Sequence, residues 1–215
     1  MLRGLVLGLS MLVAHGVSAH DNVSVGVNIG FNLVGYPHLV PIPGYPVYYA
    51  PQVPADYFFY DGLYWVYAGG NWYESSWYNG PWMMVAPVYV PAFVLRVPVR
   101  YYRYAPPSFH HWHADAAPHW GEVWGPQWQA QRHDWDHWNH HVPHRAPLPG
   151  YQHEYAGNRY PAASPEQYAL RAQRYRYHPN DEMTKRHWND GVPRTGDEHQ
   201  RDDDGHREHE RNDAH

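Results

Sequence analysis

The chain of 215 residues carries 16 Lys and Arg against 21 Asp and Glu, a formal net charge of −5, and it contains 19 His, 11 Trp, 20 Tyr and no Cys. The absence of cysteine excludes disulfides, Cys-based zinc sites, thiol catalysis and acylation of a lipobox cysteine. No block of the chain is basic enough for a nucleic-acid footprint, so we expect no nucleic-acid partner.

The first nineteen residues have the three parts of a signal peptide. A short basic start ends at Arg3, residues 4–14 are an apolar run, and residues 17–19 have the small-x-small pattern of a signal-peptidase site. The apolar run is too short to span a bilayer, and no later run approaches that length. We therefore predict cleavage after Ala19, export to the periplasm or cell surface, and no transmembrane segment in the mature chain.

Residues 22–34 alternate apolar and polar side chains along their whole length, from Val23 to Leu33. This pattern predicts one half-buried strand. A lipid-facing strand of an outer-membrane barrel has the same alternation, but such a barrel needs about eight strands of this quality. We therefore favour a strand of a soluble sheet. Residues 36–54 contain six prolines, which predict an extended linker or a strap laid over the sheet.

Residues 57–90 are the centre of the predicted fold, a small antiparallel β-meander. Asp61-Gly62 and Asn79-Gly80 can supply the positive φ values of two-residue hairpin turns, and residues 69–71 form a further turn. Aromatic residues flank these turns. The fold class is therefore mainly β, with a domain over residues 20–104 whose last strand covers residues 91–104, with Pro98 at an edge or break.

Residues 105–180 form a Pro/His/Trp-rich extension with one or two short helices. Gly121, Gly125 and Pro126 prevent a continuous helix through the first Trp cluster, but residues 127–141 lack a breaker and predict a helix that ends before Pro143. Ser164 and Pro165 predict the start of a second helix, over residues 167–177. Residues 181–215 have hardly any apolar side chains and predict a disordered tail.

Four groups of residues carry a resemblance to a known family. They are residues 67–72, where Gly69 and Gly70 precede Trp72; the segment WYESSWYNGPW at residues 72–82; the segment VLRVPVRYY at residues 94–102; and the two Trp-Gly pairs that begin at Trp120 and Trp124. Together they resemble exported bacterial proteins with a Tyr-x-Trp-Gly-x-Trp or Trp-x-x-Gly-x-Trp repeat. Gly69 stands where that motif has its first Trp, so no intact copy is present. The resemblance covers residues 44–138 and implies a signal peptide, an envelope location and no established activity.

The aromatic residues of the meander have two interpretations. Tyr and Trp on a flat sheet can stack on sugar rings, and they can equally form the core of a small sheet that has few aliphatic residues. We favour the core. If a ligand does bind here, the contact candidates are Trp72, Trp77, Trp82, Tyr73 and Tyr78.

Histidine gives the strongest chemical signal. On a helix over residues 127–141, with about 100° per residue, one side carries His133, His137, His140 and His141. Spacings of four residues let two imidazoles share a metal ion, and Asp134 borders the stripe as a further candidate ligand. Such a thiol-free site favours Cu²⁺ over Ni²⁺ and Zn²⁺. The alternative is a solvated helix face.

The sequence contains no zinc-protease, P-loop, nucleophile-elbow or dinucleotide motif. We therefore expect a non-enzymatic envelope protein that acts through aromatic contacts with peptidoglycan, another polysaccharide or an envelope protein. The alternatives are a Cu-, Zn- or Ni-binding protein and an outer-membrane-associated factor. No catalytic residue is assigned, and the oligomeric state is left open.

Overall fold

Six antiparallel strands in sequential order form the centre of the computed structural model, which describes residues 28–188. They are β1 (Val40–Pro41), β2 (Val47–Tyr49), β3 (Asp56–Tyr60), β4 (Leu63–Ala68), β5 (Asn71–Ser75) and β6 (Met83–Val85). Each strand pairs with the next along the chain. The prediction of an antiparallel meander is confirmed.

Two of the three predicted turns are tight hairpins. Asp61 and Gly62 have φ values of 50° and 95° between β3 and β4, and Gly69 and Gly70 have φ values of 56° and 81° between β4 and β5. These positive values match the right-handed twist of the flanking strands. The third prediction is wrong, because Gly80 lies in a longer connection, residues 76–82, which buries Trp77 and Tyr78 before β6 begins.

The segments before β3 differ from their predictions. Residues 28–34 alternate in burial as expected but are not a strand, because Gly30 has a φ of 87° and the backbone N–H of Leu33 donates to the Asn79 side chain (2.7 Å) instead of to a neighbouring strand. Residues 22–27 lie outside the described residues. The Pro-rich segment of residues 36–54 is not a strap over the sheet. It supplies β1 and β2, and Pro41 lies in the edge strand, where its missing N–H costs no ladder bond.

The predicted strand over residues 91–104 is wrong. The chain forms α1 (Ala92–Leu95) between two 3₁₀ turns, η1 (Pro87–Tyr89) and η2 (Val99–Tyr101). Pro91 and Pro98 are the residues just before α1 and η2, where a fixed φ suits the start of a helical turn. Val94 and Leu95 of α1 are fully buried. Helical residues make up 33% of the structure and strand residues 16%. The fold is therefore an antiparallel β-meander covered by short helices, and the predicted fold class, mainly β, is corrected to this extent.

Helix α2 (Trp120–Gln131) is two short helices joined at Gly125, whose φ of 81° and ψ of 176° are not helical, and Pro126 begins the second one. The sequence predicted this interruption and a helix that starts after Pro126, but its predicted extent to residue 141 is wrong, since α2 ends at Gln131. The next residue, Arg132, is buried, and its Nη1 donates to the carbonyls of Val88 (2.5 Å) and Val90 (3.0 Å). These tertiary bonds turn the chain inward and end the helix.

The remaining helical elements of the described residues are one 3₁₀ turn before α2 and four elements of the C-terminal third. Two 3₁₀ turns, η4 (Gly150–Glu154) and η5 (Gly157–Arg159), precede α3 (Ser164–Arg174) and α4 (Glu182–Trp188), and η3 (Pro107–His111) lies before α2. Helix α3 is the predicted second helix, shifted three residues toward the N-terminus, with Ala163 rather than Ser164 as its N-cap. No helix within residues 28–188 combines the length and apolar character needed to cross a bilayer.

Helix α4 contradicts the prediction that disorder begins at residue 181. The Asp181 carboxylate accepts the backbone N–H groups of Met183 (2.9 Å) and Thr184 (3.0 Å) and so caps the helix. The Asp61 carboxylate accepts the N–H groups of Asn180 and Asp181, which fixes the start of α4 to the β3–β4 turn. The rest of the predicted tail, residues 189–215, lies outside the described residues.

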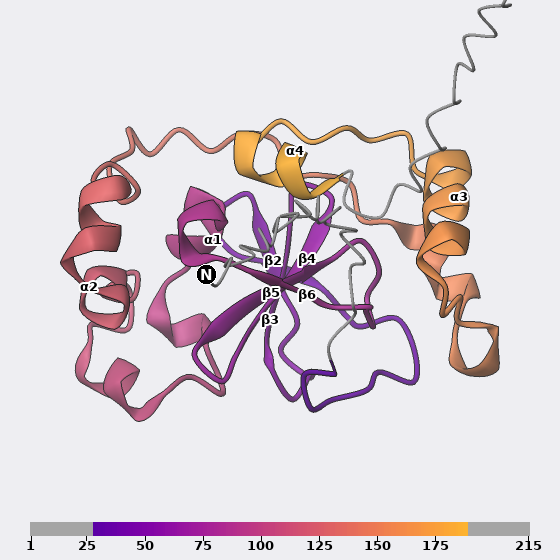
Figure 1. The fold of residues 1–215 in the computed structure, drawn as a ribbon, viewed down its shortest axis with the longest axis horizontal. Helices are drawn as coiled ribbons and strands as arrows, with labels where there is room; N and C mark the ends of the chain where they lie inside the picture. Colours follow the sequence, from indigo (N-terminus) through magenta and orange to yellow (C-terminus); the bar gives the residue numbers. More distant parts are fainter. Residues whose placement is uncertain (1–27, 189–215) are drawn as a thin grey trace, which may run out of the picture.

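The sheet is covered on both faces, with α1 and α2 on one side, α3 on the other and α4 across one end (Figure 1). One core joins Phe58, Trp65 and Trp72 to Phe109 and Trp120, and the other joins the opposite strand faces to residues 29–36 and 146–160. The ordered core therefore continues beyond Tyr104, where the sequence predicted its end.

Candidate functional site

The five predicted ligand-contact residues of the meander lie in the interior. Their exposed fractions are between 0 and 8%, for Trp72, Trp77, Trp82, Tyr73 and Tyr78. Because the covering segments occupy both faces of the sheet, none of these five rings presents a free face to a ligand in this structure.

Trp77 and Tyr78 illustrate why these rings are buried. The indole N–H of Trp77 donates to the carbonyl of Gln167 in α3 (3.2 Å), and its ring meets those of Tyr151, Tyr155 and Tyr160 edge to face. The Tyr78 hydroxyl donates to the carbonyl of Tyr155 (2.6 Å). Their polar atoms are thus satisfied by the C-terminal third of the chain, as buried Tyr and Trp require.

The predicted metal ligands do not share a helix face. His133, His137, His140 and His141 lie on exposed turns and extended chain after α2. His137 is near Asp136 (Nε2 to Oδ1, 4.0 Å), and Asp134 is exposed. Within the described part of the chain, no group of three or more His, Cys, Asp or Glu side chains is arranged to hold a metal ion.

A cleft of about 540 Å³ lies where α2 faces the segment that follows it. Its rings come from distant parts of the chain, since the ring of Tyr45 packs against that of Trp138 in a tilted arrangement, with centroids 5.5 Å apart and planes at 31°. We call it the α2 cleft, and it is lined by Tyr45, Arg96, Ala116, Ala117, Pro118, His119, Trp120, Gly121, Glu122, Gln129, Trp135, Asp136 and Trp138.

Arg96, the residue after α1, holds this cleft together. Its Nε donates to the carbonyl of Trp135 (2.5 Å) and its Nη2 to that of His137 (2.9 Å). Its guanidinium lies 5.5 Å from the ring centroid of Trp138, a cation–π distance. Burial lowers the pKa of Arg96 and raises that of Tyr45. Both shifts leave the charged guanidinium and the protonated hydroxyl at neutral pH.

The floor and rim of the α2 cleft carry hydrogen-bonding groups. The Gln129 amide lies so close to Gly121 that a Cβ there would be 2.5 Å from its oxygen. A carboxylate oxygen of Glu122 lies 2.8 Å from Nδ1 of His119, which is hydrogen-bond distance. Asp136, another lining residue, is exposed. A concave site with aromatic walls and a few polar groups is typical of small-ligand binding, and such sites have volumes of about 300–1,000 Å³.

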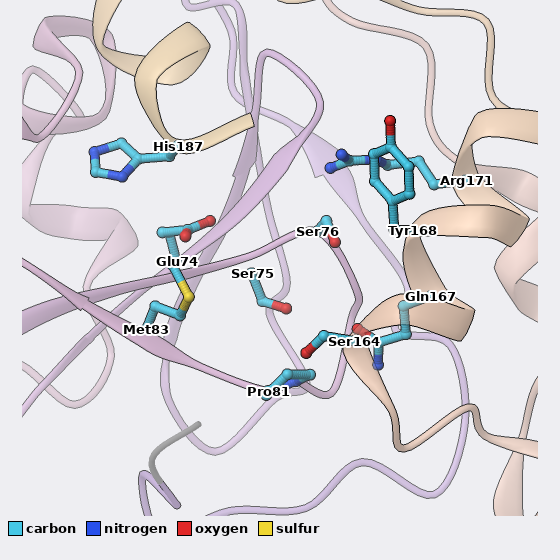
Figure 2. A pocket seen from close by; sticks show the side chains of 10 residues that line it. All are labelled: Glu74, Ser75, Ser76, Pro81, Met83, Ser164, Gln167, Tyr168, Arg171 and His187. Atoms are coloured by element: carbon cyan, nitrogen blue, oxygen red, sulfur yellow. The ribbon is translucent and has the colours of Figure 1, made fainter. Parts of the chain in front are cut away.

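Figure 2 shows a second, much smaller pocket, which we call the Glu74 pocket, where β5 and β6 meet α3 and α4. Its polar wall includes four buried residues: Glu74, Ser75, Gln167 and Arg171. His187 of α4 lies beside Glu74 and Arg171 points in from α3. The amide of Gln167 donates to the carbonyls of Gly80 (2.9 Å) and Pro161 (2.7 Å).

Size separates the two sites. The Glu74 pocket has a volume of about 30 Å³, space for water but not for an organic ligand. We therefore interpret it as the polar junction between the sheet and α3, and the α2 cleft as the candidate binding site.

Comparison with known proteins gives no family for this chain. No family model, curated protein or solved structure matches it. The resemblance to exported repeat proteins stays a prediction from the residues, and the candidate site is assigned from its geometry alone.

Sequence reasoning identified Trp120 and Gly121 but not the cleft they help to form. The expected helix over residues 127–141 would have placed Trp135 and Trp138 on one docked face. The cleft instead depends on two features. Helix α2 ends at Gln131, and Arg96, 35 residues earlier in the chain, binds the segment that follows this helix. The two Trp-Gly pairs at residues 120–125 were the only local feature of the sequence that pointed to this part of the chain.

Proposed function

We propose that this chain is an exported, non-enzymatic cell-envelope protein that binds glycan through the α2 cleft. The observation that carries the proposal is the pair of rings, Tyr45 and Trp138, at the side of a cleft that also presents a guanidinium, an amide and two carboxylates. The α2 cleft thereby takes the role that sequence reasoning gave to Trp72, Trp77 and Trp82.

The chemistry of the α2 cleft suits a sugar ring. The C–H groups of a pyranose carry partial positive charge and pack on the negative face of an aromatic ring. Its hydroxyls both donate and accept, so Gln129, Asp136 and Arg96 could meet them in either sense. Export, predicted from residues 1–19, would bring the cleft to peptidoglycan and surface polysaccharide.

Sedimentation with purified peptidoglycan tests the proposal. The mature protein should co-sediment, and Trp138→Ala and Tyr45→Ala should each weaken binding by about tenfold, since an aromatic contact contributes about 0.5–1.5 kcal/mol beyond its buried area. Tyr104→Ala is the matched control, because Tyr104 is 57% exposed and does not line the cleft. Circular dichroism of each variant confirms folding.

Three results would overturn the proposal. Equal binding by Trp138→Ala, Tyr45→Ala and Tyr104→Ala would remove the cleft from the interaction. Release of soluble fragments from peptidoglycan by the wild-type protein, lost in Asp136→Asn or Glu122→Gln, would replace a binding role with a hydrolytic one. Retention only by a protein of the outer-membrane fraction would exclude a glycan partner.

Binding of Cu²⁺, Ni²⁺ or Zn²⁺ by the His-rich segment is the second candidate. It is favoured by the exposure of His133, His137, His140 and His141, four imidazoles within nine residues that a metal ion can reach. Because they do not share a helix face, binding would first have to rearrange this segment, part of which Arg96 holds through the carbonyls of Trp135 and His137.

A further inference from the structure

A second large cleft is lined by residues of α3, of α4 and of the segment between them. Helix α3 lies on the opposite side of the sheet from α2 (Figure 1). Its volume is about 830 Å³. Four aromatic rings and several cationic or titratable side chains line it, and we call it the α3–α4 cleft: Tyr168, Arg171, Ala172, Tyr175, Arg176, Tyr177, His178, Pro179, Lys185 and Trp188. Among these lining residues there is no Asp or Glu.

Arg171 is the innermost cation of the α3–α4 cleft. The residue is 5% exposed, its guanidinium lies 4.1 Å from the ring centroid of Trp188, and its Nη2 donates to the Trp188 carbonyl (2.7 Å). Tyr168 lies over the same guanidinium at 5.5 Å, and Figure 2 shows the two side chains together on α3. Burying a guanidinium is costly unless a counter-charge compensates it, and the buried carboxylate of Glu74, which lines the Glu74 pocket together with Arg171, acts on it electrostatically.

The outer cations are less constrained. Arg176 is exposed and forms no ion pair with any residue of the described range. Lys185 is exposed and pairs with Glu182 (2.6 Å), and the carboxylates of Asp61 and Asp181 also act on it electrostatically. Asp61 and Asp181 accept backbone N–H groups of residues 180–184, and neither of them lines the cleft. The lining residues themselves therefore carry two guanidinium groups and one ammonium group beside the rings, and no carboxylate.

We propose that the α3–α4 cleft binds an acidic saccharide, with the phosphate or carboxylate of the sugar on Arg171 and Arg176 and the sugar ring against Tyr168. A guanidinium offers paired N–H donors that match the oxygens of a carboxylate or a phosphate. The tyrosine ring supplies a face for the C–H groups of the sugar. This site is separate from the α2 cleft and does not depend on its function.

Matched ligands separate the charge from the ring. The full mature protein is titrated by calorimetry with trigalacturonate and with its methyl ester, which has the same rings without the charges, and with glucose 6-phosphate and glucose for the phosphate group. The charged member of each pair should bind at least about tenfold more tightly, and binding should weaken between 50 and 300 mM NaCl, roughly as screening shortens the range of charge interactions. A response in only one pair identifies the acidic group.

Variants locate the site. Arg176→Gln should weaken binding of the charged saccharide about tenfold, and Arg171→Lys should also weaken it because the paired donors are lost. Arg103→Gln is the control, an exposed arginine that does not line the cleft. If Arg171→Lys impairs folding, the surface variant Arg176→Gln decides. Three results would each overturn the proposal: no preference for the charged member in either pair, equal affinity for glucose 6-phosphate and inorganic phosphate, or no difference between Arg176→Gln and Arg103→Gln. Trp138→Ala in the α2 cleft should leave this binding unchanged.

Discussion

The hydroxyl of Tyr177 donates a hydrogen bond of 2.5 Å to the carboxylate of Asp61, which lies 116 residues earlier in the first hairpin turn. The same carboxylate accepts the backbone N–H groups of Asn180 and Asp181 (both near 3 Å). Asp61 is 5% exposed, so these bonds form away from bulk water. A residue selected by the hairpin for its positive φ thus also fixes the start of α4.

Replacing Asp61 should release α4 before it unfolds the sheet. Asp61→Gly keeps a residue that accepts the φ of 50° but removes every acceptor, and we expect a loss of about 2–3 kcal/mol, as is typical for buried hydrogen bonds to a charged group. Asp61→Asn, which keeps one oxygen, should lose less, and Tyr177→Phe about 1 kcal/mol. Urea unfolding gives the stability, and limited proteolysis within residues 177–188 gives the release. Protection of that segment in Asp61→Gly equal to wild type would contradict the assignment.

Asp56 should make the fold less stable as the pH rises. Burial raises the pKa of this carboxyl to about 6, although the N–H groups of Arg103 (2.6 Å) and Tyr104 (2.8 Å) act in the opposite direction. When the folded pKa exceeds that of the unfolded chain, 3.8, the stabilisation is complete below pH 3.8 and is lost as the pH rises through about 6. The loss amounts to about 3 kcal/mol.

The variant Asp56→Asn isolates this effect, because its oxygen still accepts both N–H groups and nothing titrates. Urea unfolding at pH 4, 5, 6 and 7 should show wild type losing stability relative to the variant as the pH increases. A constant difference between the two proteins over this range would show that Asp56 titrates as it does in the unfolded chain.

Trp77 should behave as a core residue. Its ring is fully buried among Tyr151, Tyr155 and Tyr160, so Trp77→Ala should destabilise the protein by about 3–5 kcal/mol. Trp77→Phe keeps most of the ring and should cost less. Thermal unfolding followed by near-ultraviolet circular dichroism measures both. A stable Trp77→Ala protein with weakened peptidoglycan binding would contradict this role. It would favour the other interpretation, in which the aromatic residues of the meander contact a ligand.

Copper binding to the His-rich segment is testable with one central residue. Calorimetric titration at pH 7.4 should give affinity in the order Cu²⁺, then Ni²⁺ and Zn²⁺, because imidazole nitrogens are the ligands that the segment offers. His137→Ala should reduce Cu²⁺ affinity more than the control His178→Ala, since His178 is exposed in the α3–α4 cleft, away from the cluster in sequence. Equal losses of Cu²⁺ affinity in the two variants would show that the four histidines form only a solvated surface.

The parts of the fold that follow from local chemistry were predictable from the sequence. Asp61-Gly62 and Gly69-Gly70 form the expected turns because positive φ is a property of those residues, and Gly125 and Pro126 interrupt α2 for similar reasons. The meander between these turns follows from its aromatic runs.

The parts that failed depend on distant partners. No residue close to Arg132 in the sequence predicts that its side chain binds the carbonyls of Val88 and Val90, where α2 ends. Likewise, the polar segment that forms α4 is held at its start by a hydrogen bond to the distant Asp61. The α2 cleft could not be predicted for the same reason, since Arg96 joins it through carbonyls of residues 135 and 137. Local pattern gives no information about such contacts.

The segments that cover the sheet also determine the order in which the parts of the fold can form. Strands β3 to β5 carry large rings on both faces, and the residues that cover the second face, such as Tyr151 and Tyr160, follow β6 by more than sixty positions. A chain still emerging from the ribosome therefore holds strands whose second aromatic face is only partly covered, by residues 29–36, until the last third of the chain is made. Contacts between residues far apart in the sequence slow folding and leave intermediates that expose apolar surface and aggregate. The yield of folded protein should consequently depend on chaperones that hold the unfinished chain more than on the stability of the finished protein.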